Sequence, residues 1–327
     1  MKIRLIWCIL ILSCASSWAQ KGTIMFYNVE NLFDTFDDTT KSDNEFLPQS
    51  QRHWTNQRYY QKLDQLYKAI SSCSEWDAPA IIGLCEVENR YVLNGLVLKT
   101  ELSKQGYQIA HAESADVRGI DCAVLYNPKQ FKLISFEAIR PYIARNIKTR
   151  DIAYCKGLWG KDTLHVFVNH WPSRLGGQAK SEWKRMVTSQ LLKQRVDSIL
   201  VHNSSALIIA MGDFNDDLPS ASIQNLISPS DGKDAPLLNL SISAGSAPGS
   251  LKYRSSWYVY DHIFISCALN KYVVSSQMTI CNAPQLQETD VKNMGTKPFR
   301  SYAGLKYTGG FSDHLPVLMQ IDTKKRK

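Results

Sequence analysis

Short apolar runs recur along the chain and alternate irregularly with amphipathic stretches. The runs are typical of buried strands and cover residues 23–29, 80–85, 122–126, 164–169, 206–211, 258–266 and 315–321. Apolar side chains recur at helical spacing over 56–71, and a long helix is expected over 178–202. Strands that are apolar throughout are covered on both faces. The pattern therefore predicts an α/β protein with sheets inside and helices outside.

Three long polar stretches, rich in turn-forming residues, interrupt this frame at 34–51, 228–250 and 285–306. Loops of this length in a compact domain tend to form functional rims. The first begins with an acidic run, DTFDD at 34–38, but its spacing does not match a calcium-binding loop. We therefore do not expect a dedicated calcium site there. No fixed repeat and no Pro/Ser-rich linker divides the chain, which favours one domain.

The first 19 residues are typical of an export signal. Lys2 and Arg4 precede an apolar run over 5–12, and small residues end at Ala19. The run is too short to cross a bilayer, and no later apolar stretch is long enough, so we expect no transmembrane segment. Cleavage after Ala19 leaves a single domain over 20–327 with a basic C-terminal tail, periplasmic or extracellular. The alternative is a lipoprotein cut before Cys14 and anchored there.

The composition is that of a globular protein, with 327 residues, 44% of them hydrophobic and 21% charged. It excludes a disordered polyelectrolyte and a collagen-like fibre. The formal charge of +8 suggests a polyanion partner. However, Lys2 and Arg4 carry two of these charges and the tail residues 324–327 carry four, which leaves +2 for the folded body. The net charge therefore says little about the partner.

Six cysteines remain beyond the signal, and they show no spacing typical of a zinc site. Cys85, Cys122 and Cys155 lie inside apolar runs, where a free cysteine behaves as a small buried hydrophobe. We therefore expect structural thiols rather than a disulfide framework. Nothing in the sequence implies a stable protein partner, so we expect a monomer.

Polar side chains that can bind a metal or transfer a proton follow many of the apolar runs. The motifs are NVEN at 28–31, GLCEVEN at 83–89, NHWPSR at 169–174, GDFND at 212–216, YDHI at 260–263 and SDHLPV at 312–317. Each alone is more typical of a turn or a cap. Together they supply the hard oxygen ligands that Mg²⁺ prefers and two histidines that transfer protons near neutral pH.

In this order, the motifs resemble those of the endonuclease/exonuclease/phosphatase superfamily, which includes deoxyribonuclease I. They span Asn28 to His314, nearly the whole mature chain. The resemblance implies a deoxyribonuclease I-like, four-layer α/β sandwich, in which two mixed β-sheets pack together and are flanked by helices. It places the active site at one edge, where strand ends meet.

The resemblance also implies a metal site. Glu86 would be the principal metal carboxylate, assisted by Asn28 and Asp313. Mg²⁺ is the expected cation, with Mn²⁺ or Ca²⁺ as alternatives. The cation would neutralise charge on the transferring phosphoryl group.

The same resemblance implies catalytic roles for five residues. Asp213 would orient or activate the attacking water, and Asn215 would donate to a phosphate oxygen. His314 would be the general base or a transition-state partner, held in its tautomer by Asp261. His170 would stabilise the phosphorane-like charge or protonate the leaving oxygen. Whether Asp213 or His314 accepts the water proton stays open.

Five further residues have candidate supporting roles. Glu30 and Glu88 lie two positions from Asn28 and Glu86, so alternation in a strand places them on the same faces, as rim carboxylates or as ligands of a second metal. Asp121 is expected to support His170, and Arg118 to reach phosphate. Arg174, in the SRLGG stretch at 173–177, either helps to cradle phosphate or lies in a plain loop.

The leading hypothesis is an exported, Mg²⁺-dependent phosphoesterase, most plausibly a nuclease that cleaves DNA or RNA. A phosphatase or phosphodiesterase acting on a lipid head group, inositol phosphate or nucleotide is the alternative, because the fold does not select the substrate. The loops show no clear aromatic wedge for membrane contact, which ranks a sphingomyelinase lower. A binding module without turnover is the third hypothesis. The presence of both histidines and all the expected carboxylates argues against it, because binding alone does not require them.

Overall fold

The computed structural model describes residues 21–74, 77–144, 147–229 and 235–323. The expected signal over 1–19, the alternative anchor at Cys14 and the basic tail over 324–327 lie outside the described residues.

Two mixed sheets form the centre of the molecule. The first has the strand order β10-β14-β19-β1-β2-β4-β3. Its strands are β10 (Ser241–Ile242), β14 (Gln277–Ile280), β19 (Val317–Asp322), β1 (Lys21–Leu32), β2 (Ile81–Val87), β4 (Asp121–Tyr126) and β3 (Gln108–His111). Strand β1 runs parallel to β2 and antiparallel to β19.

The second sheet has the order β5-β6-β7-β8-β13-β9. Its strands are β5 (Phe131–Ile139), β6 (Ile152–Trp159), β7 (Asp162–His170), β8 (Leu207–Asp213), β13 (Asp261–Ile265) and β9 (Leu238–Asn239). Strand β7 runs parallel to β8, and β13 runs antiparallel to β8. Each sheet thus contains a parallel pair at its centre, and in the first sheet β10 also runs parallel to β14.

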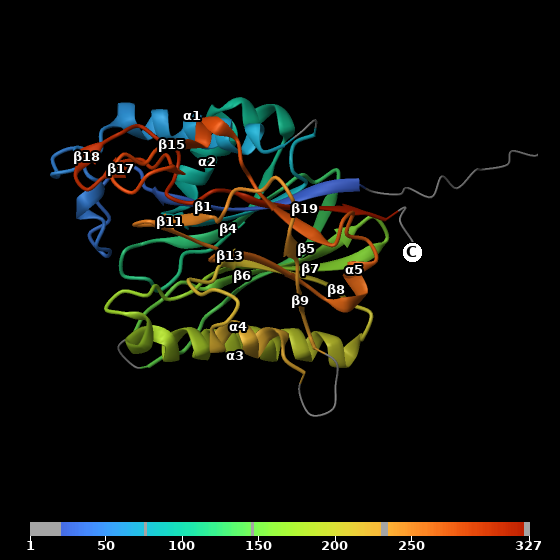
Figure 1. Cartoon of the computed structure of the whole chain (residues 1–327). Helices are drawn as coiled ribbons and strands as arrows, with labels where there is room; N and C mark the ends of the chain where they lie inside the picture. The colour runs from blue at the N-terminus through green and yellow to red at the C-terminus, as the bar shows by residue number, and fades with distance from the viewer. Residues whose placement is uncertain (1–20, 75–76, 145–146, 230–234, 324–327) are drawn as a thin grey trace, which may run out of the picture.

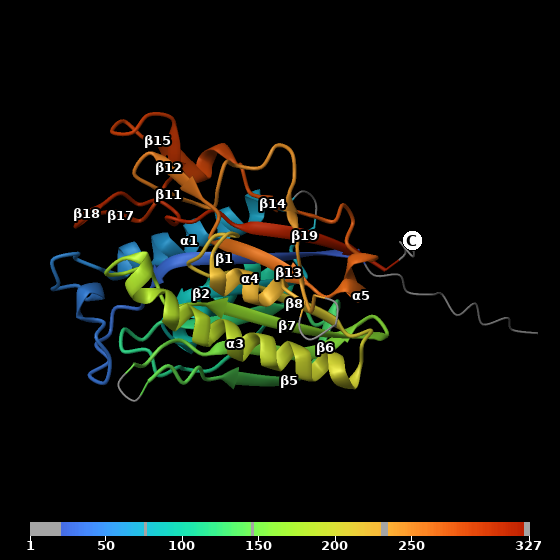
Figure 2. The same cartoon turned by 60° about the horizontal axis from the view of Figure 1, so that its bottom comes forward.

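Helices cover the outer faces and complete four layers (Figures 1 and 2). Helices α1 (Asn56–Ser72) and α2 (Arg90–Lys99) lie on the first sheet, and α3 (Gln178–His202) and α4 (Ala221–Ile227) lie on the second. Shorter helices are α5 (Cys267–Asn270) and the 3-10 turns η1 (Asn44–Phe46), η2 (Glu101–Gln105) and η3 (Pro284–Leu286). No helix in the described ranges is long and apolar enough to cross a membrane.

The inner faces of the sheets pack directly on each other. At Gly83 of β2, a Cβ would lie 2.8 Å from carbon atoms of both Val168 in β7 and Met211 in β8. A larger side chain would therefore push the sheets apart, and interiors packed as densely as crystals do not absorb such a change. This close approach fixes how the ends of β2 face the ends of β7 and β8.

The structure confirms the predicted sandwich and corrects several local expectations. The run 258–266 is two elements, because β12 (Ser256–Tyr258) pairs with β11 (Leu251–Tyr253) and the chain then turns into β13. The polar stretch 285–306 holds two hairpins rather than plain loop. They are formed by β15 (Gln287–Thr289) with β16 (Thr296–Pro298), and by β17 (Tyr302–Ala303) with β18 (Lys306–Tyr307).

The prediction of structural thiols is confirmed for three cysteines and wrong for two. Cys85, Cys122 and Cys155 are free and buried, as predicted. Cys73 and Cys281, however, form a disulfide that joins the end of α1 to the segment after β14. They lie 208 positions apart, and neither follows a motif, so the sequence contains no sign of their proximity.

Candidate active site

The sheet topology brings the predicted strand ends to one edge. Parallel neighbours end at the same edge, and an antiparallel neighbour begins there. Strands β1, β2, β7 and β8 therefore end where β13 begins and where the segment before β19 passes. The side chains gathered at this edge are Asn28, Glu86, His170, Asp213, Asp261 and His314.

A histidine between two carboxylates lies at the centre of the site. His314 Nδ1 is 2.7 Å from Asp261 Oδ2, and its Nε2 is 3.8 Å from Asp213 Oδ2. Asp261 and Asp213 are direct neighbours in the register of β13 and β8. All three side chains are buried, with side-chain exposures between 1% and 7%. The expected pairing of His314 with Asp261 is thus present.

These charges shift each other's pKa. Burial alone would lower the pKa of His314, but the carboxylates of Asp261 and Asp213 raise it well above 6.5. Burial raises the pKa of Asp213; His314 opposes this rise, and Asp261 adds to it. The two carboxylates therefore favour a proton on His314.

His170 is the second histidine beside Asp213. Its Nε2 is 3.7 Å from Asp213 Oδ2 and 3.8 Å from Glu86 Oε1. Burial lowers the pKa of His170 well below 6.5, and the positive charges of Arg150, Arg118 and His314 lower it further. Within the described residues its Nδ1 has no hydrogen-bond partner. The site thus contains one imidazole that favours the charged form and one that favours the neutral form.

Asn28 and Glu86 reach the site through distorted strand ends. Asn28 Nδ2 donates to Asp213 Oδ2 at 3.1 Å, which links the two sheets. Glu86 has φ +62 at a bulge in β2, where the pairing with β4 shifts by one residue. A bulge turns the side chain relative to a regular strand. Asn31 donates from its backbone N–H to Glu86 Oε2 at 2.9 Å, so the bulge aims and fixes this carboxylate.

Close packing of the backbone requires the glycine of the GDFND motif. A Cβ on Gly212 would lie 2.3 Å from the backbone oxygen of Asn169, its neighbour across β7 and β8. Beyond it, Asn215 takes φ +51 and donates from its backbone to Asp213 Oδ1 at 2.9 Å. The Asn215 amide donates to the backbone oxygen of Trp171 at 3.1 Å. Asp213 therefore has a fixed orientation.

A salt-bridge network at the rim was not foreseen. Arg300 donates to Glu30 Oε1 at 3.0 Å and to Asp313 Oδ2 at 3.0 Å. Glu30 Oε2 also accepts from the backbone of Ser301 at 2.7 Å. Glu30 is thus a rim carboxylate with an arginine partner. No motif surrounds Arg300, so only the tertiary structure identifies it.

Two supporting residues have other partners than the expected ones. Asp121 pairs with His111 Nε2 at 3.2 Å and with the backbone of Ser114 at 2.8 Å, whereas His170 lies near Glu86 and Asp213. Residues 114–120 form a turn that folds back onto Asp121, which explains the change of partner. Arg174 binds Asp216 and Asp217, and its guanidinium lies over the Tyr260 ring. This network holds the guanidinium in place, and its reach to a phosphate stays a prediction.

Glu88 and Arg118 have local partners. Glu88 accepts from the backbone of Asp34 at 2.6 Å, and burial raises the pKa of Glu88 to about 8. Arg118 is half-exposed and lies 3.6 Å from Asp116. Its reach to a phosphate stays a prediction.

The donor set fits a divalent cation. Glu86 Oε1 makes no hydrogen bond within the described ranges, and Asn28 Oδ1 uses one lone pair to accept from the backbone of Glu30. Asp313 is partly exposed and shared with Arg300. A second group, Asp213, Asp261 and His314, has ligand atoms within 4.8 Å of one another. Hard oxygen ligands dominate both sets, and such ligands suit Mg²⁺, Mn²⁺ or Ca²⁺.

A sequence model of the Endonuclease/Exonuclease/phosphatase family matches residues 23–323. The chain belongs to this family. It is therefore a phosphoesterase in the broad sense that covers the family's nucleases and phosphatases. The match confirms the resemblance seen in the strand-end motifs.

Solved structures of other proteins share the fold. TDP2 from Caenorhabditis elegans superposes with a TM-score of 0.57 at 13% identity, covering 93% of this chain and 74% of that one. The human Nocturnin catalytic domain with bound sulfate gives 0.54 at 18% identity, covering 92% and 93%. A mannosyl-6-phosphatase from Bacteroides thetaiotaomicron gives 0.53 at 15% identity, covering 91% and 98%. Comparison with curated protein sequences finds no significant match.

Proposed function

We propose that this family member is an exported, divalent-metal-dependent nuclease that hydrolyses phosphodiester bonds of DNA or RNA with an activated water. One observation carries the catalytic part of the proposal. Asp213 lies within 3.8 Å of both His170 and His314, and Asn28 binds it from the other sheet. A buried carboxylate between two imidazoles is suited to proton transfer and charge stabilisation.

We assign the water proton to Asp213 on geometric grounds. His314 lies between two carboxylates, and this position favours the imidazolium over the neutral base. Asp213 then accepts the proton, while His314 stabilises the charge that develops on the phosphoryl oxygens. His170 donates a hydrogen bond to the same group. The fixed positions of these donors require little reorganisation during the reaction.

Glu86 and Asn28 would hold the metal, with Asp313 at the rim. When bound, a divalent cation supplies charge neutralisation at the phosphoryl oxygens. The backbone N–H of Asn31 keeps one Glu86 oxygen occupied, so Oε1 is the atom left to bind. Mg²⁺ is the proposed ion because its usual ligands are one or two carboxylates with waters and substrate phosphates.

A small phosphoester is the second candidate substrate. A pocket of about 230 Å³ beside the site, lined by Glu30, Asn31 and Arg300 among others, can hold a compact group. One of the structural relatives is a mannosyl-6-phosphatase. A sugar phosphate or nucleotide therefore joins the substrates to be tested.

Hydrolysis assays test the proposal directly. The purified protein is incubated with supercoiled plasmid, single-stranded RNA, bis-p-nitrophenyl phosphate and a panel of sugar phosphates, with Mg²⁺ or with EDTA. We expect metal-dependent cleavage of the plasmid or the RNA. Turnover of monoesters alone would identify a phosphatase, and no turnover of any phosphoester would favour a binding module.

Export is a separate part of the proposal. The disulfide between Cys73 and Cys281 supports it, because such bonds persist in oxidising compartments. Expression of the whole chain in a Gram-negative host, followed by mass measurement of the purified protein, tests it. We expect an N-terminus at Gln20 in the exported fraction. A lipid-modified Cys14 would support the anchored alternative, and an intact Met1 in the cytoplasm would contradict export.

A further inference from the structure

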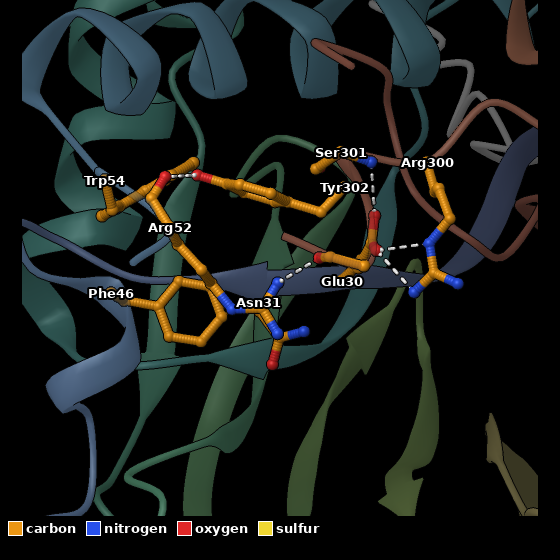
Figure 3. A pocket seen from close by; sticks show the side chains of 9 residues that line it. Glu30, Asn31, Phe46, Arg52, Trp54, Arg300, Ser301 and Tyr302 are labelled. Atoms are coloured by element: carbon orange, nitrogen blue, oxygen red, sulfur yellow. Dashed lines mark hydrogen bonds and ion pairs between the residues drawn. The ribbon is translucent and has the colours of Figure 1, made fainter. Parts of the chain in front are cut away.

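A pocket of about 230 Å³ lies beside the proposed active site. Figure 3 shows the side chains that line it. It lies between the end of β1, the turn η1 and the β17–β18 hairpin. Its lining residues are Glu30, Asn31, Phe46, Arg52, Trp54, Arg300, Ser301, Tyr302 and Gly304. The strand-end motifs account for only the first two of these residues.

The pocket and the active site share a wall. The backbone of Asn31 binds Glu86 Oε2 at 2.9 Å, while Asn31 itself lines the pocket. Arg300 lines the pocket and binds Asp313 Oδ2 at 3.0 Å. A substrate whose phosphate lies at Glu86 would therefore place its neighbouring group in this pocket.

The aromatic rings build the wall and do not present faces to a ligand. Phe46 stacks on Phe33 with ring centroids 4.2 Å apart and meets Trp54 edge-on at 6.1 Å. Trp54 in turn lies 6.1 Å from Tyr302. The Trp54 N–H donates to Phe33, and the Tyr302 hydroxyl donates to Arg52. All are at most 9% exposed, so a base or sugar has little ring surface to stack on.

Arg52 lies against this aromatic wall. Its guanidinium carbon is 5.3 Å from the Phe46 centroid and 5.2 Å from that of Tyr302. Nε binds Glu45 at 3.0 Å, and Nη1 donates to the backbone oxygen of Gly304 at 3.1 Å. Only 23% of the side chain is exposed. The guanidinium is therefore held in one orientation before a ligand arrives.

Most of the groups left to bind a ligand are hydrogen-bond donors. Among the described residues, Arg52 Nη2, Arg300 Nη1 and the Asn31 side-chain amide have no hydrogen-bond partner. Figure 3 shows Arg52 and Arg300 entering from opposite sides of the pocket. Glu30 does not compete as an acceptor, because Arg300 and the Ser301 backbone occupy its two oxygens.

We propose that this pocket binds a second phosphate group of the substrate, next to the phosphate that is hydrolysed, through Arg52, Arg300 and Asn31. This inference rests on the proposed function for the position of the first phosphate. Two guanidinium groups that approach from different sides match the oxygens of a phosphate. The volume corresponds to about eight water molecules at roughly 30 Å³ each, enough for a phosphate and part of its sugar.

The second phosphate has two sources. In a nucleic acid it is the next phosphate of the backbone, and in a small substrate it is the second group of a bisphosphate. The chemistry at Arg52 is the same in both cases. The experiment must therefore contain both kinds of ligand.

Calorimetric binding to the full-length protein in EDTA tests the site without any turnover. The ligands are thymidine 3′,5′-bisphosphate and glucose 1,6-bisphosphate, each compared with its monophosphates. We expect at least one of the two bisphosphates to bind at least about ten-fold more tightly than its monophosphates. Equal affinities for both pairs would overturn the proposal, even if the protein proves to be an active phosphoesterase.

Substitutions then locate the effect. Arg52→Gln should remove the advantage of the second phosphate and change monophosphate affinity less than about two-fold. Arg195→Gln is the matched control, because Arg195 also pairs with a glutamate, Glu137, but lies on the outer helix α3. If Arg52→Gln does not fold, Asn31→Asp is the second variant. It keeps a residue that tolerates the left-handed backbone at φ +53 and adds a repelling charge. An advantage that survives both substitutions would overturn the proposal.

An oligonucleotide series distinguishes the two sources. If the backbone of a nucleic acid supplies the second phosphate, pdTpdTpdTpdT should bind more tightly than thymidine 3′,5′-bisphosphate, and Arg52→Gln should weaken it. If a small bisphosphate is the natural ligand, glucose 1,6-bisphosphate should bind most tightly. The oligonucleotide should then bind no more tightly than thymidine 3′,5′-bisphosphate. Either result supports the pocket, provided that Arg52→Gln abolishes the advantage.

Discussion

Asp261 Oδ2 lies 2.7 Å from His314 Nδ1, although the two residues are 53 positions apart in the sequence. The contact exists because Asp261 begins β13, the neighbour of β8, while His314 precedes β19 in the other sheet. His314 is thereby fixed in orientation with Nε2 directed toward Asp213. The pair joins the two sheets at the point where the proposed chemistry occurs.

Asp261→Asn should disable catalysis while the fold persists. Asparagine keeps the shape but loses the charge that stabilises the His314 imidazolium. We expect kcat on the cleaved phosphodiester to fall by about 10²- to 10⁴-fold. Asp197→Asn is the control, because Asp197 forms an ion pair with Lys193 on the surface of α3. Equal loss of activity in both variants, or none in Asp261→Asn, would contradict the assigned role.

Glu86→Gln should raise the metal requirement. The change removes one negative charge from the oxygen-rich set, and charge count tunes cation affinity. We expect the Mg²⁺ concentration for half-maximal activity to rise by at least about ten-fold. Glu88→Gln offers a comparison two positions away, because Glu88 binds the Asp34 backbone instead of facing the site. The metal site would be misplaced if Glu88→Gln had the larger effect.

The sandwich and most of the site could be predicted because both depend on regular elements. Asn28, His170 and Asp213 lie at the ends of apolar strands, and parallel pairing brings such ends together. Glu86 is different, because it lies at a bulge with φ +62 and the bulge, not the regular strand, directs its side chain. The alternation rule applied at positions 30 and 88 does not hold past these bulges, where the regular register ends.

The parts that could not be predicted depend on loops. Arg300 comes from the polar stretch 285–306 and Arg52 directly follows the stretch 34–51, and neither lies in a motif. Their positions follow from contacts with distant groups, the Gly304 backbone oxygen for Arg52 and the Glu30 carboxylate for Arg300. Asp121 pairs with His111, and the pattern of strands in the sequence does not predict this contact. Long loops have few local constraints, so the tertiary structure decides which of their polar side chains reach the site.

The disulfide between Cys73 and Cys281 should contribute strongly to stability. It closes a loop with a sequence separation of 208 residues. Without the bond the unfolded chain can adopt more conformations, which favours unfolding. We expect the double variant Cys73→Ser, Cys281→Ser to lose about 2–5 kcal/mol of unfolding free energy in urea. Cys155→Ser does not open a loop and serves as the comparison for a buried thiol. An unchanged unfolding midpoint in the double variant would contradict the bond.

Thiol titration gives an independent measure of the same bond. Cys267 is exposed, whereas Cys85, Cys122 and Cys155 are free and buried. Among the cysteines from Cys73 onward, Ellman's reagent should therefore detect one thiol in the native protein and four after denaturation. The two remaining thiols should appear only after reduction. Six thiols in the denatured, unreduced protein would show that the bond is absent.

The stability of the protein should fall in mild acid because of His165. This buried histidine accepts a hydrogen bond from the Tyr154 hydroxyl at Nδ1, 2.7 Å away, and burial together with Lys156 lowers the pKa of His165 to about 4. In the unfolded chain the pKa is near 6.5. Between pH 6.5 and 4 the unfolded state therefore binds a proton that the folded state excludes, so the free energy of unfolding decreases as the pH falls through this window.

His165→Asn tests this linkage. The asparagine oxygen can accept from Tyr154, but the side chain does not titrate. Urea unfolding is measured at intervals from pH 7.5 to 4 for both proteins. We expect the wild-type curve to fall more steeply than that of the variant between pH 6.5 and 4, and the two to run parallel above pH 7. His202→Asn, at the exposed end of α3, should leave the wild-type slope unchanged. Identical slopes for wild type and His165→Asn would exclude His165 as the source of acid sensitivity.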